Sequence, residues 1–161
     1  MYTSAFLLLG TNLGDRVANL AAARAALNKA GTVINTSPIY QTAAWGKTDQ
    51  PDFLNQAIEL QTSLTPQSLL ETCLAIEHQL GRQRLEHWGT RTIDIDIILY
   101  GSAIIDTPAL QLPHPRMAIR RFVLIPLAAI APNTIHPLSA QTITQLLSAC
   151  PDTLPVTPYI T

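Results

Sequence analysis

The segment TIDIDIILYG, residues 92–101, constrains the fold more than any other part of the chain. Its isoleucines alternate with Asp94 and Asp96. Side chains of a β-strand point alternately to the two faces of a sheet, so this pattern predicts a strand with one apolar and one acidic face. The two carboxylates then share a face, with their Cα atoms about 7 Å apart.

Together with the segments before it, this strand completes the predicted order strand, helix, strand, strand, helix, strand. Each predicted helix has a start signal: Asp15 as an N-cap, and Thr65 followed by Pro66. The order indicates an α+β fold, a ferredoxin-like antiparallel or mixed sheet with helices packed on it. The expected elements are a strand over 3–9, a helix from 15 to 30, strands over 32–41 and 53–61, and a helix from 65 to 80. Pro38 predicts an edge strand or a bulge near the end of the second strand.

The rest of the chain predicts loops and short elements. Residues 43–52 and 82–91 have no apolar period and are expected to be long loops. Nine of the twelve prolines follow residue 101, which predicts short strands and turns around the apolar segment 122–131. A last helix is expected over 139–149, before an extended tail over 151–161.

Size and composition predict one domain, over residues 1–161. With 47% hydrophobic residues, a chain of this length can bury a substantial core. The longest apolar run, 122–131, is short and interrupted by Pro126, so no membrane span is expected. No basic, signal-like start is present, and a cytoplasmic protein is predicted.

Cys73 shares a helical stripe with Leu69 and Ile76, which favours a buried core cysteine.

The charges argue against a nucleic-acid-binding protein and point to a small anionic ligand. The net charge is −1, so a broadly basic surface is not expected. Six of the ten basic residues nevertheless lie in two short windows. Two arginine clusters suggest one polyanionic ligand, although solvated surface arginines remain the alternative. The clusters are Arg82, Arg84 and Arg91, and Arg116, Arg120 and Arg121.

The paired carboxylates predict a magnesium site. Two charges at the spacing of Asp94 and Asp96 repel by roughly 2 kcal/mol at an effective dielectric of about 20, so a cation is their natural partner. Magnesium is commonly held by one or two carboxylates, with water and substrate phosphates completing its shell. The alternative is an ordinary strand with a solvated polar face. A Walker motif is excluded because the only lysines are Lys29 and Lys47, so ATP would be held by arginines and metal.

Five motifs in order resemble one known family over nearly the whole chain: GTNLGDR (10–16), QPDFLN (50–55), GRQR (81–84), WGTRTIDIDIILYG (88–101) and LPHPRMAIRRFVLIPL (112–127). The family is that of 6-hydroxymethyl-7,8-dihydropterin pyrophosphokinase. The resemblance implies a diphosphotransferase of folate biosynthesis. Such an enzyme moves the terminal pyrophosphate of ATP to the hydroxymethyl group of the pterin, releases AMP and uses two magnesium ions.

The resemblance also implies roles for individual residues. Asp94 and Asp96 would hold the metals and act with the catalytic loop arginines Arg82 and Arg91. The ATP site would include Glu77, Arg84, Trp88, Ile97, His114 and Arg120. The pterin site would include Thr42, Ala43, Trp45, Phe53, Asn55 and Phe122.

The residues themselves support the pterin pocket. Phe53 and Asn55 lie two apart on a predicted strand and therefore project from the same face. A flat bicyclic ring would stack on Phe53, with Phe122 on its other side, while the Asn55 amide offers a donor and an acceptor to its edge. Ordinary core packing is the alternative interpretation of both phenylalanines.

Two other functions remain open at this point. A palm-like nucleotidyltransferase also uses paired aspartates on a ferredoxin-like sheet, and a small-molecule-sensing domain would carry the same aspartates without catalysis. The expected partners are the small molecules ATP and hydroxymethyl dihydropterin, with neither nucleic acid nor membrane, and the protein is expected to be a monomer.

Overall fold

The computed structural model describes residues 1–43, 50–81 and 92–160. The elements in chain order are β1 (Thr3–Thr11), α1 (Arg16–Ala26), η1 (Leu27–Lys29), β2 (Thr32–Thr36), β3 (Tyr40–Thr42), β4 (Phe53–Thr62), α2 (Pro66–Gln79), β5 (Asp94–Tyr100), β6 (Ile105–Asp106), β7 (Gln111–Leu112), η2 (Met117–Ile119), α3 (Arg121–Ile130), α4 (Ile143–Ala149) and β8 (Val156–Pro158).

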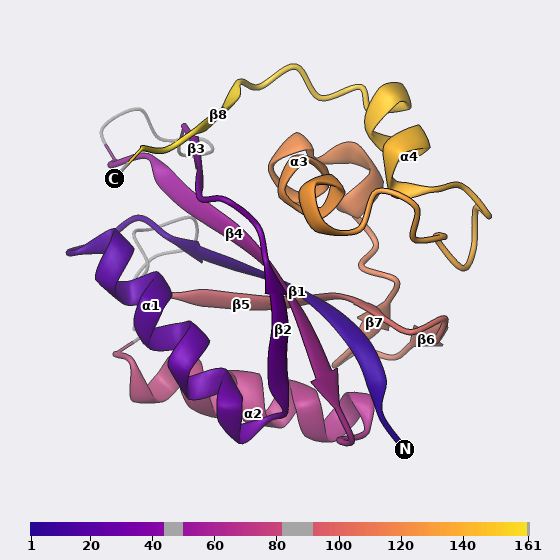
Figure 1. The fold of residues 1–161 in the computed structure, drawn as a ribbon, viewed down its shortest axis with the longest axis horizontal. Helices are drawn as coiled ribbons and strands as arrows, with labels where there is room; N and C mark the ends of the chain where they lie inside the picture. Colours follow the sequence, from indigo (N-terminus) through magenta and orange to yellow (C-terminus); the bar gives the residue numbers. More distant parts are fainter. Residues whose placement is uncertain (44–49, 82–91, 161) are drawn as a thin grey trace.

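A sheet of antiparallel pairs organises the molecule. Its strand order is β5-β1-β4-β3-β8, and β2 also pairs with β4. Helices α1 and α2 cover one face, and α3 and α4 lie on the other side (Figure 1). The elements from β1 to β5 confirm the predicted order and the ferredoxin-like α+β fold, with β2 and β3 together in the place of its second strand.

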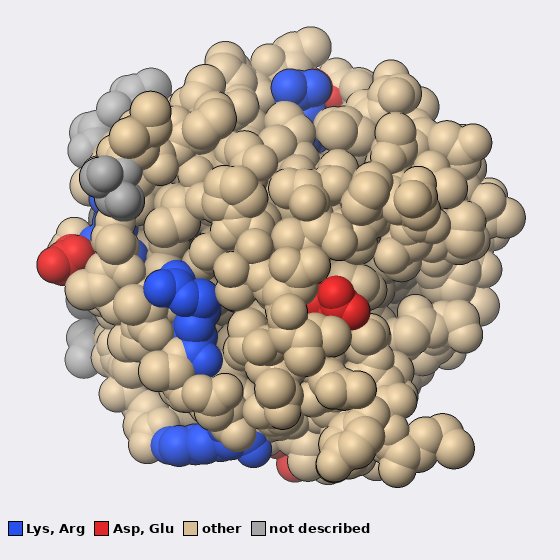
Figure 2. Space-filling view, viewed as in Figure 1, with Lys and Arg blue, Asp and Glu red and all other residues tan. Residues whose placement is uncertain are grey.

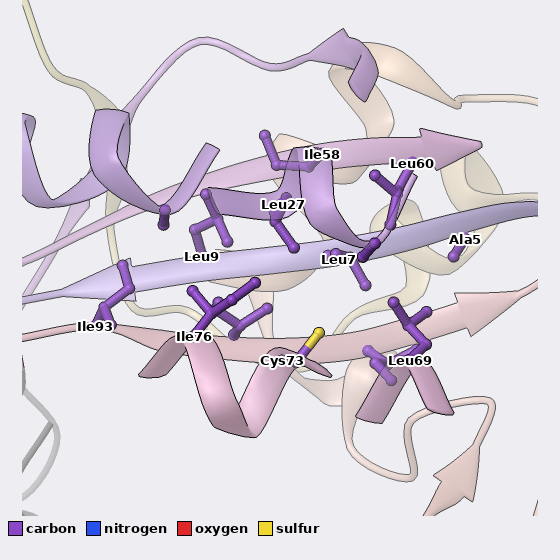
Figure 3. Packing of buried hydrophobic residues seen from close by; sticks show 14 of the residues in the cluster. Ala5, Leu7, Leu9, Leu27, Ile58, Leu60, Leu69, Cys73, Ile76 and Ile93 are labelled. Carbon is purple, nitrogen blue, oxygen red and sulfur yellow. The ribbon is translucent and has the colours of Figure 1, made fainter. Parts of the chain in front are cut away.

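The larger core lies between the sheet and the first two helices. Leu7 and Leu9 of β1 and Ile58 of β4 pack towards Ile76 and Cys73 of α2 (Figure 3). Cys73 is fully buried, and this burial is the main reason that the pKa of its thiol rises to about 12, with smaller contributions from nearby carboxylates. The predicted core role of this cysteine is confirmed.

The two predicted helix starts are also confirmed. Asp15 accepts a hydrogen bond from the backbone N–H of Ala18 at 3.1 Å, and Thr65 accepts one from Ser68 at 3.1 Å. Each side chain satisfies a donor that the first helical turn leaves without a partner.

The single strand expected over 32–41 is wrong: the chain forms β2 and β3 with a break between them. Pro38 lies in the break and has no N–H to donate to a neighbouring strand. Ser37 holds the break against β4, because its hydroxyl accepts from the Ala57 N–H at 2.9 Å and its carbonyl accepts from the Gln56 amide at 2.7 Å.

Short strands and turns do surround the apolar segment 122–131, as β6 and β7 show, and the segment itself, for which the sequence predicted no element, is helix α3. Val123, Leu124 and Leu127 recur at helical spacing and are buried under the sheet's second face. Their burial outweighs the cost of Pro126 inside the helix.

The last helix begins at Ile143 rather than 139. Thr142 is its N-cap and forms a capping box with Gln145, so residues 139–141 lie outside the helix.

The tail after α4 runs back across the molecule as an extended segment (Figure 1). It ends in β8, which pairs with β3, and the backbone N–H of Tyr159 donates to the Ile39 carbonyl at 2.8 Å. Part of the extended tail that the sequence predicted, Val156–Pro158, is therefore the strand at one end of the sheet.

Figure 2 shows the distribution of charged side chains on one face of the molecule. On the face shown in Figure 2, lysine and arginine side chains are scattered and form no continuous basic surface. No helix in residues 1–43, 50–81 and 92–160 is long and apolar enough to cross a membrane.

Candidate active site

A cleft of about 360 Å³ lies on the face of the sheet that carries α3. This volume lies within the range of small-molecule sites in proteins, about 300–1,000 Å³. Strands β1, β3, β4 and β5 form its floor, and the start of α3 and the tail form its walls. The lining residues are Leu8, Gly10, Thr42, Ala43, Phe53, Asn55, Asp94, Asp96, Arg116, Ile119, Arg120, Phe122 and Asp152.

Asp94 and Asp96 both line the cleft, as the alternation of β5 predicted. They pair across the sheet with Gly10 and Leu8 of β1. Ile95 between them is only 4% exposed and belongs to the core on the opposite face. The sheet thus places two carboxylates side by side at one end of the cleft.

Ile97, assigned to the ATP site from the resemblance, does not bring its side chain to the cleft. It pairs with Leu7 and lies in the core beneath α1 and α2. A bulge follows at Ile98, where the pairing with β1 shifts by one residue. Ile98 follows Asp94 and Asp96 on the α3 side by the ordinary alternation of the strand, and the shift brings Leu99 to that side as well, so that this face continues as an apolar one.

Phe53 and Asn55 share the cleft face of β4, as their spacing predicted. Asn55 is 4% exposed, and its amide nitrogen donates a long hydrogen bond of 3.4 Å to the Leu9 carbonyl. Within the described part of the chain, Asn55 Oδ1 and Thr42 Oγ1 are buried with no hydrogen-bond partner. An unsatisfied buried polar atom costs about 1–3 kcal/mol, so this part of the cleft is built to receive hydrogen-bonding groups.

Arg120 and Phe122 form the wall at the start of α3. The Arg120 guanidinium lies 5.5 Å from the centre of the Phe122 ring. Burial and then the neighbouring Arg116 lower the pKa of Arg120, while Asp96 and Asp152 act in the opposite direction. Arg120 remains a cation, since guanidinium groups do not deprotonate in proteins. Of the second arginine cluster, Arg116 and Arg120 line the cleft and Arg121 does not.

His114 lies beside the cleft residues Arg116 and Arg120. Its backbone N–H donates to the Ile98 carbonyl at 2.9 Å, and its Nδ1 accepts from the Arg116 N–H at 3.2 Å. Burial, followed by the charges of Arg120 and Arg116, lowers the pKa of His114 to about 4. The imidazole is therefore neutral near pH 7, with its proton on Nε2.

Glu77 reaches the site through the backbone of β5. It is 4% exposed, and its Oε2 accepts a hydrogen bond from the Ile95 N–H at 2.7 Å. β5 ends the strand order of the sheet, so this bond satisfies a donor on its outer side. The bond also holds the backbone between Asp94 and Asp96.

Five residues expected in the site lie outside the described part of the chain: Trp45, Arg82, Arg84, Trp88 and Arg91. Their expected roles stay predictions.

The structure adds four lining residues that the sequence did not assign to the site: Leu8, Gly10, Ile119 and Asp152. Arg116 was expected there only as a member of the second arginine cluster. Gly10 had a usable signal, since glycine at the end of a strand often marks a close approach of another group. For Asp152 no local pattern exists, because only the return of the tail brings it to the cleft.

The fold and the cleft define an α+β enzyme domain with two carboxylates at one end of a small-molecule cleft and an aromatic ring with an amide at the other. The family model of 7,8-dihydro-6-hydroxymethylpterin-pyrophosphokinase (HPPK) matches residues 6–132. The chain belongs to the HPPK family, the pyrophosphokinases of folate biosynthesis, and is an ATP-dependent diphosphotransferase.

Individual relatives agree with this assignment. The 2-amino-4-hydroxy-6-hydroxymethyldihydropteridine pyrophosphokinase of Synechocystis sp. is 45% identical over 154 residues, which cover 93% of this chain and 78% of the relative. The enzyme of the same name from Bacillus subtilis is 48% identical over 132 residues, covering 81% of this chain and 79% of the relative.

A solved structure supports the fold. HPPK-DHPS of Plasmodium falciparum matches 92% of this chain with a TM-score of 0.74 at 18% identity. The chain spans less than half of that longer protein, 42% of its length.

Proposed function

We propose that the chain transfers the terminal pyrophosphate of ATP to the hydroxymethyl group of 6-hydroxymethyl-7,8-dihydropterin. The hydroxymethyl oxygen attacks the β-phosphorus of ATP, and the bond from that phosphorus to the bridging oxygen of the α-phosphate breaks. That oxygen leaves with AMP, and the hydroxyl proton is lost. The proposal depends mainly on one observation: a single cleft joins two carboxylates to an aromatic pocket with unsatisfied polar atoms.

The pterin would occupy the end of the cleft that contains Phe53 and Asn55. Phe53 and Phe122 offer aromatic faces to a flat bicyclic ring. Asn55 Oδ1 and Thr42 Oγ1 would accept hydrogen bonds from the N–H groups on the edge of the pterin, which satisfies both atoms. Ala43 lines the same end. These contacts would fix the ring and aim its hydroxymethyl group towards Asp94 and Asp96.

Asp94 and Asp96 fit the magnesium that the family implies. Both are oxygen ligands on one side of one strand. Outside residues 44–49, 82–91 and 161, no three acidic, histidine or cysteine side chains come together as a metal-binding group. A two-carboxylate site of this kind suits magnesium, which takes its other ligands from water and phosphate oxygens. Bound magnesium would supply neutralisation of charge on the transferring phosphates.

Two arginines and a neutral histidine would hold the polyphosphate. Arg120 and Arg116 line the cleft, and neutral His114 has an Nε2–H to donate to a phosphate oxygen or a ribose hydroxyl. Phosphoryl transfer depends on positioning and on electrostatic stabilisation of the transferring group. Arg82, Arg84, Trp88 and Arg91, which precede β5 in the sequence, would complete the set of groups around the phosphates.

Glu77 would contribute to the ATP side by a different route. Its bond to the Ile95 N–H holds the strand that presents the two carboxylates. We therefore place Glu77 behind β5, where it orients Asp94 and Asp96.

Product analysis tests the function. The protein is incubated with magnesium and ATP, with and without 6-hydroxymethyl-7,8-dihydropterin, and the nucleotides and pterins are separated. The proposal expects AMP and the pterin pyrophosphate in equal amounts, and neither without the pterin. ADP as the product would contradict pyrophosphate transfer. Release of free pyrophosphate, with the nucleotide joined to an acceptor, would favour the palm-like nucleotidyltransferase.

A further inference from the structure

The tail beyond the family match contributes a carboxylate to the wall of the cleft. The match to the family model ends at residue 132, whereas Asp152 lies among the residues that line the cleft. Asp152 is joined to the start of α3 by a hydrogen bond of 3.0 Å from the Arg121 N–H to its Oδ2. Its Oδ1 accepts from the Leu154 N–H at 2.9 Å, which fixes the turn of the tail. Both oxygens of the Asp152 carboxylate thus accept hydrogen bonds from backbone N–H groups.

Helix α3 needs this contact because it has no cap of its own. Its N-cap residue is Arg120, with an extended backbone (φ −128°, ψ 108°) and no capping hydrogen bond from its side chain. In α1, α2 and α4 the N-cap residue itself supplies that bond, through Asp15, Thr65 and Thr142. In α3 the equivalent acceptor comes from 31 residues further along the chain. A carboxylate at this place also interacts favourably with the helix dipole.

The capped N–H belongs to the residue between two cleft side chains. Arg121 lies between Arg120 and Phe122, so a bond to its backbone restrains the direction in which both neighbours leave the chain. The charge of Asp152 also favours the cationic form of Arg120, against the effects of burial and of Arg116. The guanidinium of Arg120 in turn lies over the Phe122 ring at 5.5 Å.

We infer that Asp152 is a positioning residue that orients Arg120 and Phe122 for ligand binding. It acts through the first turn of α3 and does not itself touch the reacting atoms. Naming the ligands as ATP and the pterin rests on the proposed function. The segment after residue 132 thus contributes to ligand binding.

The test compares Asp152→Ala and Asp152→Asn with Thr142→Ala, a matched control. Thr142 caps α4 through the Gln145 N–H at 3.1 Å and is absent from the lining of the cleft. Both alanine variants remove a helix cap, so both should lower Tm by similar amounts. Only the Asp152 variant should also weaken binding, because only α3 carries cleft residues. The Asn side chain of Asp152→Asn keeps one carbonyl acceptor, so the Tm and the binding affinity of this variant should lie between those of the wild type and Asp152→Ala.

The measurements are Tm, the KM for each substrate and kcat. We expect Asp152→Ala to raise the KM for the pterin about tenfold, which corresponds to about 1.4 kcal/mol, with a smaller rise for ATP. Thr142→Ala should leave both KM values at wild-type level. Equal KM values in the two alanine variants, or a fall in Tm as the only effect of losing Asp152, would overturn the inference. If Asp152→Ala does not fold, Asp152→Asn decides by the same comparison.

A direct titration separates this inference from the proposed function. The wild type and the Asp152 variants are titrated calorimetrically with 6-hydroxymethylpterin and with a non-hydrolysable ATP analogue. If the wild type binds both but forms no AMP, the proposed reaction is wrong, while a weaker Kd in Asp152→Ala still supports positioning. Unchanged Kd values in an active enzyme would refute the positioning role alone.

Discussion

Replacing Gly10 by alanine should weaken pterin binding while leaving the fold intact. Gly10 lies on β1 between Asn55 of β4 and Asp94 of β5. A Cβ atom added at Gly10 would lie 2.8 Å from the Asn55 amide nitrogen and 3.9 Å from Phe53 Cδ1. A contact of 2.8 Å is too short to persist, so the Asn55 side chain must move. The amide is held by a long hydrogen bond of 3.4 Å to the Leu9 carbonyl, which opposes that movement weakly.

The expected magnitude follows from the hydrogen bond that is lost. If Asn55 moves, its Oδ1 no longer meets the pterin, and an unmet buried partner costs about 1–3 kcal/mol. The Kd for the pterin should therefore rise by about 5- to 150-fold. Folding stability should change little, since the displaced side chain can turn into the open cleft. Alanine is also favoured over glycine in a strand by about 0.5–1 kcal/mol, which offsets part of any strain.

Gly31→Ala supplies the opposite control. A Cβ atom there would lie 2.3 Å from the backbone oxygen of Gln61, and Gly31 is not among the residues that line the cleft. This variant should lose about 1–3 kcal/mol of stability and keep the pterin Kd of the wild type. Calorimetric titration and thermal melts on both variants measure the two quantities. An unchanged pterin Kd in Gly10→Ala would refute the assignment of Asn55 to the pocket.

Three further predictions follow from the same geometry. Asp94→Asn and Asp96→Asn should each lower AMP release by about a hundredfold or more, with little change in Tm, because a neutral amide is a poor magnesium ligand. Phe53→Ala should weaken pterin binding about tenfold and leave ATP binding nearly unchanged, as titration with each ligand would show. His114 has a pKa of about 4 in the fold against 6.5 ordinarily, so the unfolded chain binds more protons between these pH values. The free energy of unfolding should therefore decrease as the pH drops from 6.5 to 4. In His114→Gln this decrease should be smaller by up to about 3 kcal/mol, as denaturant titrations at the two pH values would show.

Each of these predictions has a result that would contradict it. Near-normal AMP release from both aspartate variants would remove them from the metal site. Equal losses of ATP and pterin affinity in Phe53→Ala would make Phe53 a support of the fold. An identical dependence of stability on pH in wild type and His114→Gln would show that the histidine is not held neutral.

The sequence by itself determined the local geometry of the site. The alternation around Asp94 and Asp96 and the spacing of Phe53 and Asn55 depend only on the two-residue period of a strand. The starts of α1 and α2 depend only on a capping side chain a few residues from its donors, which Asp15 supplies in α1. Such features follow from contacts between neighbours in the chain, and the structure confirms them.

The tertiary structure decided what depends on distant partners. The segment around Pro126 is helical because its leucines and valine are buried against the sheet, and this long-range packing outweighs the proline that argued against a helix. Leu99 lies on the α3 side because the pairing of β5 with β1 shifts at the bulge, which the alternation of the strand alone does not predict. Asp152 enters the cleft only because β8 pairs with β3 and draws the tail across the molecule. Local periodicity sets which face a side chain takes, whereas long-range pairing and burial set what that face meets.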